Sequence, residues 1–197
     1  MRIPLDRTTP DNFYWMNKPN FTFSSEKLTV TTSDETDFWQ RTHYGFSRDN
    51  GHAMLSSIPG NFRITVKTVF NYISQYDQCG IFLRIDGLNW IKVAAEREDS
   101  ERSRLGSVIT NLGYSDWATS DIDSQISELW YRVGCKDNDF VIESSPDGTI
   151  WTQMRIAHLH SRQRPLNAGI FACSPKAGGF NAEFSELSIE LEKKAEA

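Results

Sequence analysis

Alternation of apolar and polar residues with a period of two constrains the fold of this chain more than any other sequence feature. Between Phe62 and Tyr72, the even positions carry apolar or aromatic residues and one threonine, while most odd positions carry Arg, Thr, Lys or Asn. Side chains of a β-strand point alternately to opposite faces, so this segment is predicted to be a strand with one buried face. Such strands are typical of antiparallel sheets.

Similar segments recur along the chain and are separated by turn-forming sequences such as Asp-Asn-Gly at 49–51 and Pro-Asp-Gly at 146–148. Short strands at this spacing predict an all-β sandwich or barrel. Two short helices are also candidates, at 123–129 and in the Glu-rich tail after Ser185. The predicted strands are 27–32, 53–58, 62–72, 79–86, 90–95, 105–111, 129–135, 140–143, 150–156, 167–173 and 180–191.

Composition narrows the class of protein and its partners. The 197 residues are 24% charged and 39% hydrophobic, with a net charge of −5, which is typical of a folded domain rather than a disordered chain. No apolar run reaches the ~20 residues of a membrane-spanning helix, and the first 15 residues lack the apolar core of a signal peptide. Because Lys and Arg are scattered, we expect no nucleic-acid partner and no membrane partner.

The cysteines indicate the cellular compartment, and the absence of linkers indicates the number of domains. Cys79, Cys135 and Cys173 are an odd number without a CxxC pair, so we expect reduced thiols and a cytoplasmic protein. No stretch rich in Gly, Ser or Pro divides the chain. We therefore expect residues 1–197 to form a single domain.

One predicted hairpin allows its two faces to be assigned. A three-residue loop at 87–89 pairs Asp86 with Trp90 and Arg84 with Lys92, and this register places the aliphatic side chains of both strands on one face. The opposite face, which we expect to point outward, carries Arg84, Asp86, Trp90, Lys92 and Glu96.

Short motifs in a fixed order link the chain to a family. These motifs are Thr-Asp-Phe-Trp at 36–39, Tyr-Asp-Gln-Cys-Gly at 76–80, Trp-Ile-Lys at 90–92, Ser-Val-Ile-Thr at 107–110, Tyr-Ser-Asp-Trp at 114–117, Ser-Pro-Asp-Gly at 145–148 and Ala-Cys-Ser-Pro at 172–175. The matches run from about residue 12 to residue 191, and together they resemble the uncharacterised domain family typified by the yeast regulation-of-enolase protein. The resemblance implies a concanavalin A-like jelly-roll sandwich of two antiparallel sheets, in a superfamily that includes lectins and glucanases.

The outward face of the hairpin is the main candidate for a ligand site. An indole ring binds the C–H face of a sugar, and charged neighbours bind its hydroxyl groups, so Trp90 with Lys92, Arg84 and Glu96 suits a carbohydrate on a concave sheet. The alternative is a set of cross-strand salt bridges with Trp90 covering its neighbours. The sequence leaves both interpretations open.

Three further residues join the candidate set. Asp116 and Trp117 follow the predicted strand 105–111 in what we expect to be a loop, where Trp117 either closes a binding groove or fills the end of the sandwich. Asp77 has the parity of buried aliphatic residues, so its carboxylate needs a partner such as Lys92 or a turn N–H group.

Other chemistry receives less support. We expect no metal and no cofactor, because His158 and His160 lack an evident third ligand and Cys173 lacks an evident base. Glu96, Glu98 and Glu101 resemble the carboxylate strand of some glucanases, but the polar run around them predicts a solvated loop. The sequence does not place His43 and His52 in a site.

Three hypotheses for function follow. The first is a non-catalytic cytoplasmic module that binds a small sugar, a sugar phosphate or a glycan. The second is a glycoside hydrolase or lyase that uses Glu96 with Asp77 or Asp116 as its carboxylate pair. The third, implied by the resemblance, is a regulator that binds a metabolic enzyme such as enolase.

Overall fold

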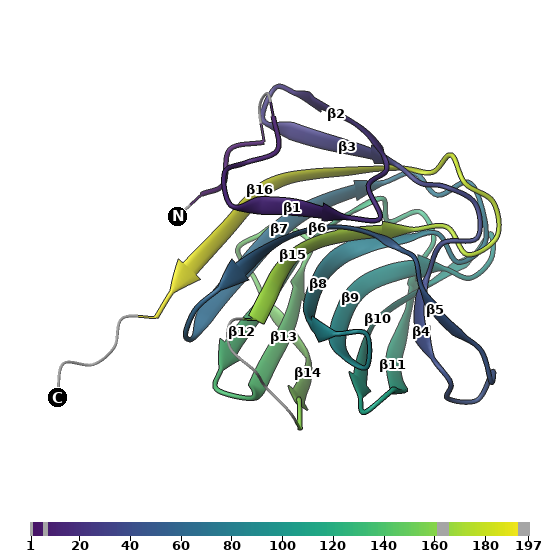
Figure 1. Cartoon of the computed structure of the whole chain (residues 1–197). Coiled ribbons are helices and arrows are strands. Elements are labelled where there is room, and N and C mark those ends of the chain that lie inside the picture. Colours follow the sequence, from purple (N-terminus) through teal and green to yellow (C-terminus); the bar gives the residue numbers. More distant parts are fainter. Residues whose placement is uncertain (1, 6–7, 161–165, 193–197) are drawn as a thin grey trace, which may run out of the picture.

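The computed structural model describes residues 2–5, 8–160 and 166–192, which form antiparallel strands and no helix. Two large sheets stack face to face, and a short hairpin flanks one of them (Figure 1). This arrangement confirms the predicted all-β sandwich of two antiparallel sheets. In the described ranges, no helix could cross a membrane.

The first sheet has seven strands and carries the candidate site. Its members in spatial order are β1 (Phe13–Met16), β6 (His52–Ile58), β15 (Leu166–Cys173), β8 (Gln78–Asp86), β9 (Asn89–Arg97), β10 (Arg102–Asn111) and β11 (Tyr114–Asp123).

The second sheet also has seven strands, and a separate two-stranded hairpin joins β4 (Phe38–Gln40) to β5 (Ser47–Asp49). The strands of the second sheet in spatial order are β14 (Thr152–His158), β13 (Asp139–Ser145), β12 (Glu128–Lys136), β7 (Phe62–Phe70), β16 (Asn181–Leu191), β3 (Lys27–Thr31) and β2 (Asn20–Ser24).

The main core lies between the two sheets and follows the period-two pattern. Phe62, Ile64, Val66 and Phe70 on β7 are at most 1% exposed, while Arg63 between them is exposed. From the first sheet, the aliphatic face of the β8–β9 hairpin packs against the same core. Burial of each such side chain contributes roughly 1.5–3 kcal/mol to folding, and this holds the sheets together.

The β8–β9 hairpin keeps the predicted faces but not the predicted register. Arg84 pairs with Trp90 and Phe82 with Lys92, because a two-residue turn at 87–88 and a bulge at Ile85 together shift the pairing by two residues. A shift of two leaves every side chain on its original face, so the aliphatic set remains inside. The predicted pairing of Asp86 with Trp90 is wrong.

The outward face of the first sheet is covered where we expected it to be open. The β4–β5 hairpin lies beside β11 in Figure 1 and places Phe38 over β8 and β9. Phe38 stacks on Phe82 at 4.2 Å between ring centroids and lies 6.2 Å from the ring of Trp90. A second hydrophobic cluster therefore forms outside the sandwich, composed of Phe38, Trp39, Ala53, Leu55, Phe82, Trp90, Ala94, Val108, Phe171 and Cys173.

Several local expectations are wrong. Residues 123–129 contain the end of β11, a turn and the start of β12, and residues 186–191 continue β16, so neither described segment forms a helix. The rest of the predicted tail helix, residues 193–197, lies outside the described residues. Residues 114–117 begin strand β11 rather than forming a loop. Strands β1, β2, β4, β5 and β11 have no counterpart among the predicted strands: β1, β4, β5 and β11 lack a clear alternation, and the alternation of β2 spans only five residues.

The second cluster predicts a measurable difference between two phenylalanines of one hairpin. Phe38→Ala removes a ring that is 0% exposed, so we expect the free energy of unfolding to fall by about 3–5 kcal/mol. Phe46→Ala removes a ring that is 42% exposed, and we expect a loss below about 1 kcal/mol. Urea unfolding measures both; equal losses would contradict the second cluster.

Candidate functional site

A cavity of about 510 Å³ opens on the outward face of the first sheet, beside the β4–β5 hairpin. Side chains from the hairpin, from β9 to β11 and from two loops surround it. Its lining consists of Asp37, Trp39, Tyr44, Phe46, Arg48, Tyr76, Lys92, Glu96, Glu98, Val108, Trp117, Pro175 and Lys176.

A buried ion pair lies in the cavity wall and joins the hairpin to the sheet. Lys92 Nζ on β9 donates to Asp37 Oδ1 at 3.0 Å, and the two side chains are only 6% and 11% exposed. Burial lowers the pKa of Lys92, but the attraction of Asp37 and Glu96 outweighs burial and raises it. Lys92 is therefore a fixed positive charge at neutral pH.

Glu96 lies on the same face of β9, two pleats beyond Lys92. Gln78 Nε2 donates to Glu96 Oε2 at 2.6 Å. Burial raises the pKa of Glu96 to about 8. The attraction of Lys92 lowers this pKa, and the repulsion of Asp37 and Glu98 offsets part of that lowering. Near pH 7 this carboxyl is largely protonated, so it can donate a hydrogen bond to a ligand.

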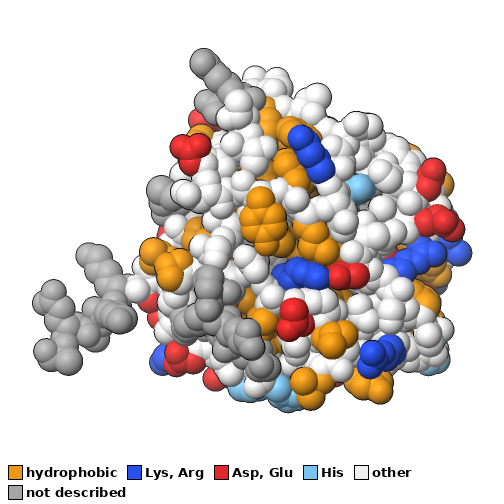
Figure 2. Space-filling view, viewed as in Figure 1, with side chains coloured by type: hydrophobic (Ala, Val, Ile, Leu, Met, Phe, Trp, Pro, Cys, Tyr) orange, Lys and Arg blue, Asp and Glu red, His pale blue; other side chains and the backbone are white. Residues whose placement is uncertain are grey.

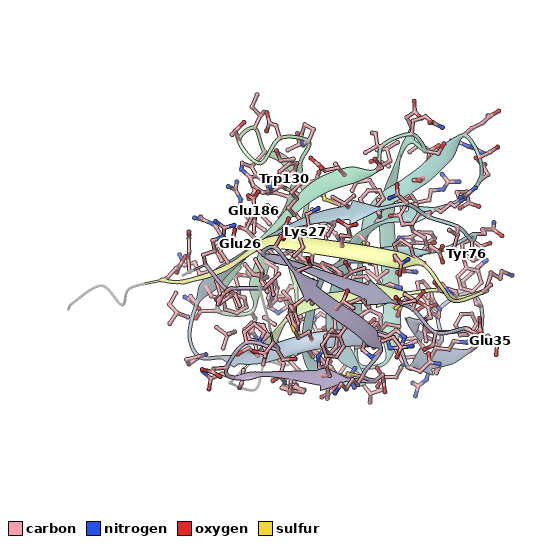
Figure 3. All side chains as sticks on the ribbon, turned by 90° about the horizontal axis from the view of Figure 1, so that it is seen from above. Glu26, Lys27, Glu35, Tyr76, Trp130 and Glu186 are labelled. Carbon is pink, nitrogen blue, oxygen red and sulfur yellow. The ribbon has the colours of Figure 1, made fainter. Side chains whose placement is uncertain are left out.

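Aromatic side chains form much of the remaining wall. Trp39 lies edge-on to Trp117 at 6.5 Å and to Tyr44 at 5.3 Å between ring centroids. Tyr76 enters from the loop before β8 (Figure 3). The indole nitrogen of Trp39 donates to Thr42 O at 3.0 Å, which fixes this ring in place. The wall is therefore apolar and rigid at Trp39.

Two cations lie among these aromatic rings. Arg48 donates to Glu35 O at 2.8 Å and lies 5.9 Å from the ring centre of Phe46. Lys176 lies 5.6 Å from the ring centre of Tyr76. In Figure 3 the labelled Glu35 and Tyr76 lie at the same end of the molecule, on the side away from Trp130.

The structure brings together three of the residues singled out from the sequence. Lys92, Glu96 and Trp117 all line the cavity. Trp90 does not, since it is 0% exposed beneath Phe38, and its predicted stacking on a ligand is wrong for this structure. The β4–β5 hairpin, which the sequence did not predict, occupies the space over its ring.

The other three predicted residues make structural contacts outside the cavity lining. Arg84 forms two 2.7 Å hydrogen bonds to Asp49 and so clamps β5 to the sheet. Asp116 pairs with Arg155 of β14 at 2.8 Å.

Asp77 is buried and serves the loop before β8. It accepts from the backbone N–H groups of Ile73 and Ser74 and from the hydroxyl of Ser174. Turn N–H groups are thus among its partners, as the sequence suggested, whereas Lys92 pairs with Asp37 instead.

The sequence analysis did not identify four residues that line the cavity, and it placed Glu96 in the wrong kind of element. Asp37, Trp39, Tyr44 and Tyr76 received no site role, although the motifs at 36–39 and 76–80 contain three of them. The aromatic pair Phe38-Trp39 and the later Gly45, which has a φ of 74°, could have indicated a short strand and a turn, but not that this hairpin covers the sheet. Glu96 was expected in a solvated loop but lies within β9, which extends to Arg97.

The candidate cysteine and histidines are not part of the cavity lining. Cys173 is buried at the end of β15, and burial raises its thiol pKa far above the ordinary value, so it is no nucleophile. The ring of His52 bonds Ser33 N at 3.0 Å and Asn17 O at 2.5 Å. His158 pairs with Asp139 at 2.7 Å, and His43 packs its ring against Tyr44.

The raised pKa of Glu96 predicts how stability depends on pH. Between its ordinary pKa of 4.5 and about 8, the folded chain holds a proton that the unfolded chain releases, so this stability is lost as pH rises through 8. Glu96→Gln cannot titrate, so we expect its stability relative to wild type to improve by about 1–3 kcal/mol from pH 5 to pH 9. Urea unfolding at both values measures this, with Glu190→Gln as an exposed control. A constant difference would rule out the shift.

Comparison with known proteins identifies relatives of the whole chain. Residues 15–192 match the family described as "Protein of unknown function (DUF1349)". "Regulation of enolase protein 1" of Saccharomyces cerevisiae is 38% identical over 176 residues, which cover 89% of this chain and 87% of the yeast protein. The resemblance seen in the sequence motifs is thereby confirmed.

Solved structures share the fold. A crystal structure of a functionally unknown protein from Saccharomyces cerevisiae matches with a TM-score of 0.85 and 34% identity, covering 93% of this chain and 98% of that one. A Bacteroides ovatus xyloglucan-locus GH43B matches at TM-score 0.75 and 12% identity, covering 97% of this chain but only 39% of that one. The exoplasmic/lumenal domain of VIP36 matches at TM-score 0.57 and 9% identity, covering 95% and 90%.

These matches confirm the concanavalin A-like jelly-roll sandwich, and the last two show likeness of fold alone. With a family model over residues 15–192 and a 38% identical relative of nearly the same extent, the chain belongs to the DUF1349 family.

Proposed function

We propose that the cavity binds a small carbohydrate or sugar phosphate and that the protein is a non-catalytic binding module. The observation that carries this proposal is the pairing of aromatic walls at Trp39 and Trp117 with the polar groups of Lys92 and Glu96 in one cavity. A sugar has apolar C–H faces and a rim of hydroxyl groups, and it needs both kinds of contact.

The size and the hydrogen-bonding groups suit such a ligand. The volume of about 510 Å³ falls within the range of about 300–1,000 Å³ that is usual for small-molecule sites. Glu96 in its protonated form donates a hydrogen bond, and Lys92 supplies a charged donor. The ion pair with Asp37 positions Lys92 before a ligand arrives, which lowers the entropy cost of binding.

The charges favour a neutral or singly anionic ligand. Lys92, Arg48 and Lys176 are cationic, whereas Asp37 and Glu98 are anionic and Glu96 is largely protonated near pH 7. Arg48 and Lys176 also lie next to aromatic rings, where they can meet a phosphate or carboxylate group on a sugar. The charges and contacts in the cavity therefore support sugar phosphates as well as neutral sugars.

Substitution of Trp117 tests the proposal. We expect Trp117→Ala to weaken binding of the responsive sugar about 5-fold or more, because an aromatic contact of this kind contributes about 1 kcal/mol or more. Isothermal titration of wild type with monosaccharides, short oligosaccharides and hexose phosphates identifies that sugar first.

Trp130→Ala is the matched control, since Trp130 is also a partly exposed tryptophan but belongs to β12 of the second sheet. Its binding should equal that of wild type. An equal loss in both variants, or no binding of any sugar by wild type, would overturn the proposal.

A hydrolase or lyase is the second candidate, and the raised pKa of Glu96 favours it. A carboxyl that stays protonated near neutral pH can act as a general acid. The expected partners Asp77 and Asp116 do not line the cavity, so Asp37 or Glu98 would have to be the second carboxylate. Oligosaccharide cleavage that disappears in Glu96→Gln would establish this function in place of simple binding.

The name of the yeast relative motivates the third candidate, a regulator that binds a metabolic enzyme such as enolase. Outside the cavity, Leu88, Leu112 and Tyr114 are 44%, 61% and 60% exposed on two adjacent turns. On the face shown in Figure 2, hydrophobic side chains form small groups among polar and charged ones. Failure to recover a stoichiometric enzyme partner from native lysate would count against this candidate.

The same proposal places the module in the cytoplasm as a single domain. The thiols of its three cysteines are buried, which suits a reducing compartment. Fractionation of cells that make the protein tests this location, and recovery with the secreted fraction would contradict it.

A further inference from the structure

A second cavity, of about 400 Å³, lies at one end of the sandwich, where the loop after β7, the β9–β10 turn and the β11–β12 turn meet. It is distinct from the cavity described above, since the two share no lining residue. Its lining consists of Phe70, Asn71, Tyr72, Arg97, Asp99, Ser100, Ser103, Ser124, Gln125 and Ser127.

Strand alternation explains why two cavities occur at one strand end. Glu96 and Glu98 line the first cavity, whereas Arg97 and Asp99 between them line the second. Adjacent residues of a strand point to opposite sides, so the end of β9 separates the two cavities. The first cavity is largely aromatic, while the second presents mainly hydroxyl, amide and charged groups.

The walls of the second cavity are held by hydrogen bonds between its loops. Arg97 Nη1 donates to Tyr72 O at 2.8 Å, which joins β9 to the segment after β7. Ser124 Oγ donates to Ser100 O at 2.6 Å, and Ser124 N donates to Glu101 O at 3.1 Å. The cavity is therefore formed in advance of any ligand.

The carboxylates in and beside this cavity already accept hydrogen bonds. Asp99 Oδ1 accepts from the backbone N–H groups of Glu101 and Arg102, and its Oδ2 accepts from the guanidinium of Arg102 at 2.9 Å. The carbonyl oxygens of Tyr72 and Ser100 accept the bonds described above. Asp77, the other carboxylate near Arg97, accepts three hydrogen bonds of its own.

Two donors, by contrast, have capacity left. Within the described part of the chain, the guanidinium of Arg97 donates one hydrogen bond, while the exposed side chains of Asn71, Gln125 and Ser127 offer both donor and acceptor groups. The hydroxyl of Ser103, a residue that is 0% exposed, has no partner among the described atoms. A buried hydroxyl without a partner costs about 1–3 kcal/mol, so this group needs an explanation.

We propose that the second cavity binds a small oxyanion, a phosphate group either free or carried by a small metabolite. Such a ligand supplies acceptors only, which suits the remaining N–H donors of the cationic Arg97 and the unpartnered hydroxyl of Ser103. The charge of Arg102 offsets that of Asp99. A phosphate group is far smaller than the cavity, so the remaining volume accommodates an organic substituent.

Titration with inorganic phosphate, a hexose phosphate and the corresponding unphosphorylated hexose tests this inference by calorimetry at low ionic strength. We expect Arg97→Gln to weaken phosphate binding at least 10-fold, and the control Arg63→Gln on β7 to leave it unchanged. Binding of inorganic phosphate alone identifies the free ion as the ligand, whereas tighter binding of the hexose phosphate that Arg97→Gln weakens and Trp117→Ala does not identifies the metabolite. No binding of either phosphate, or equal losses in both variants, would overturn the proposal.

Ser103→Ala separates a ligand role from a structural one. It removes an unpartnered hydroxyl, so we expect unchanged or higher stability together with phosphate binding weakened severalfold. Lower stability with unchanged binding would contradict the proposal. Trp117 lines only the first cavity, so the Trp117→Ala variant should bind inorganic phosphate as wild type does. Failure of the carbohydrate proposal and failure of this proposal can therefore be distinguished.

Discussion

The buried ion pair between Lys92 and Asp37 is the interaction on which the cavity depends. Two charges removed from water are costly unless they meet, and loss of one partner of such a pair typically costs about 3–5 kcal/mol. The 3.0 Å contact therefore fixes the start of the β4–β5 hairpin against β9. Arg84 and Asp49 form a second clamp at β5, and Phe38 fills the space between the two clamps. The hairpin in turn supplies much of the aromatic wall.

This covering hairpin explains why the same sheet face contains both a core and a cavity. Where Phe38 lies over β8 and β9, the outward face is as dry as the interior, and Trp90 is fully buried. Farther along β9, beyond the ring of Phe38, Lys92 and Glu96 line open space. Low local polarity beside that space is what raises the pKa of Glu96 to about 8. The chemistry of the site thus follows from partial covering of one sheet.

The sequence predicted the architecture better than the site. Period-two alternation was sufficient for the long strands and for the two faces of the β8–β9 hairpin, because parity survives a register shift of two. It could not show that a three-residue strand, Phe38–Gln40, folds over the face that we expected to be open. We therefore expected Trp90 to stack on a ligand, whereas Phe38 covers its ring in the structure. Trp117 was expected in a loop but lies in β11. Burial by a distant segment is a tertiary property, and local patterns do not contain it.

The most direct test of the account is a crystal structure of the protein soaked with monosaccharides, short oligosaccharides and hexose phosphates. The account predicts sugar density in the cavity between Trp39 and Trp117, with polar contacts to Lys92 or Glu96 and with the β4–β5 hairpin in place. An empty cavity at saturating concentrations, or a sugar bound on another surface, would contradict it.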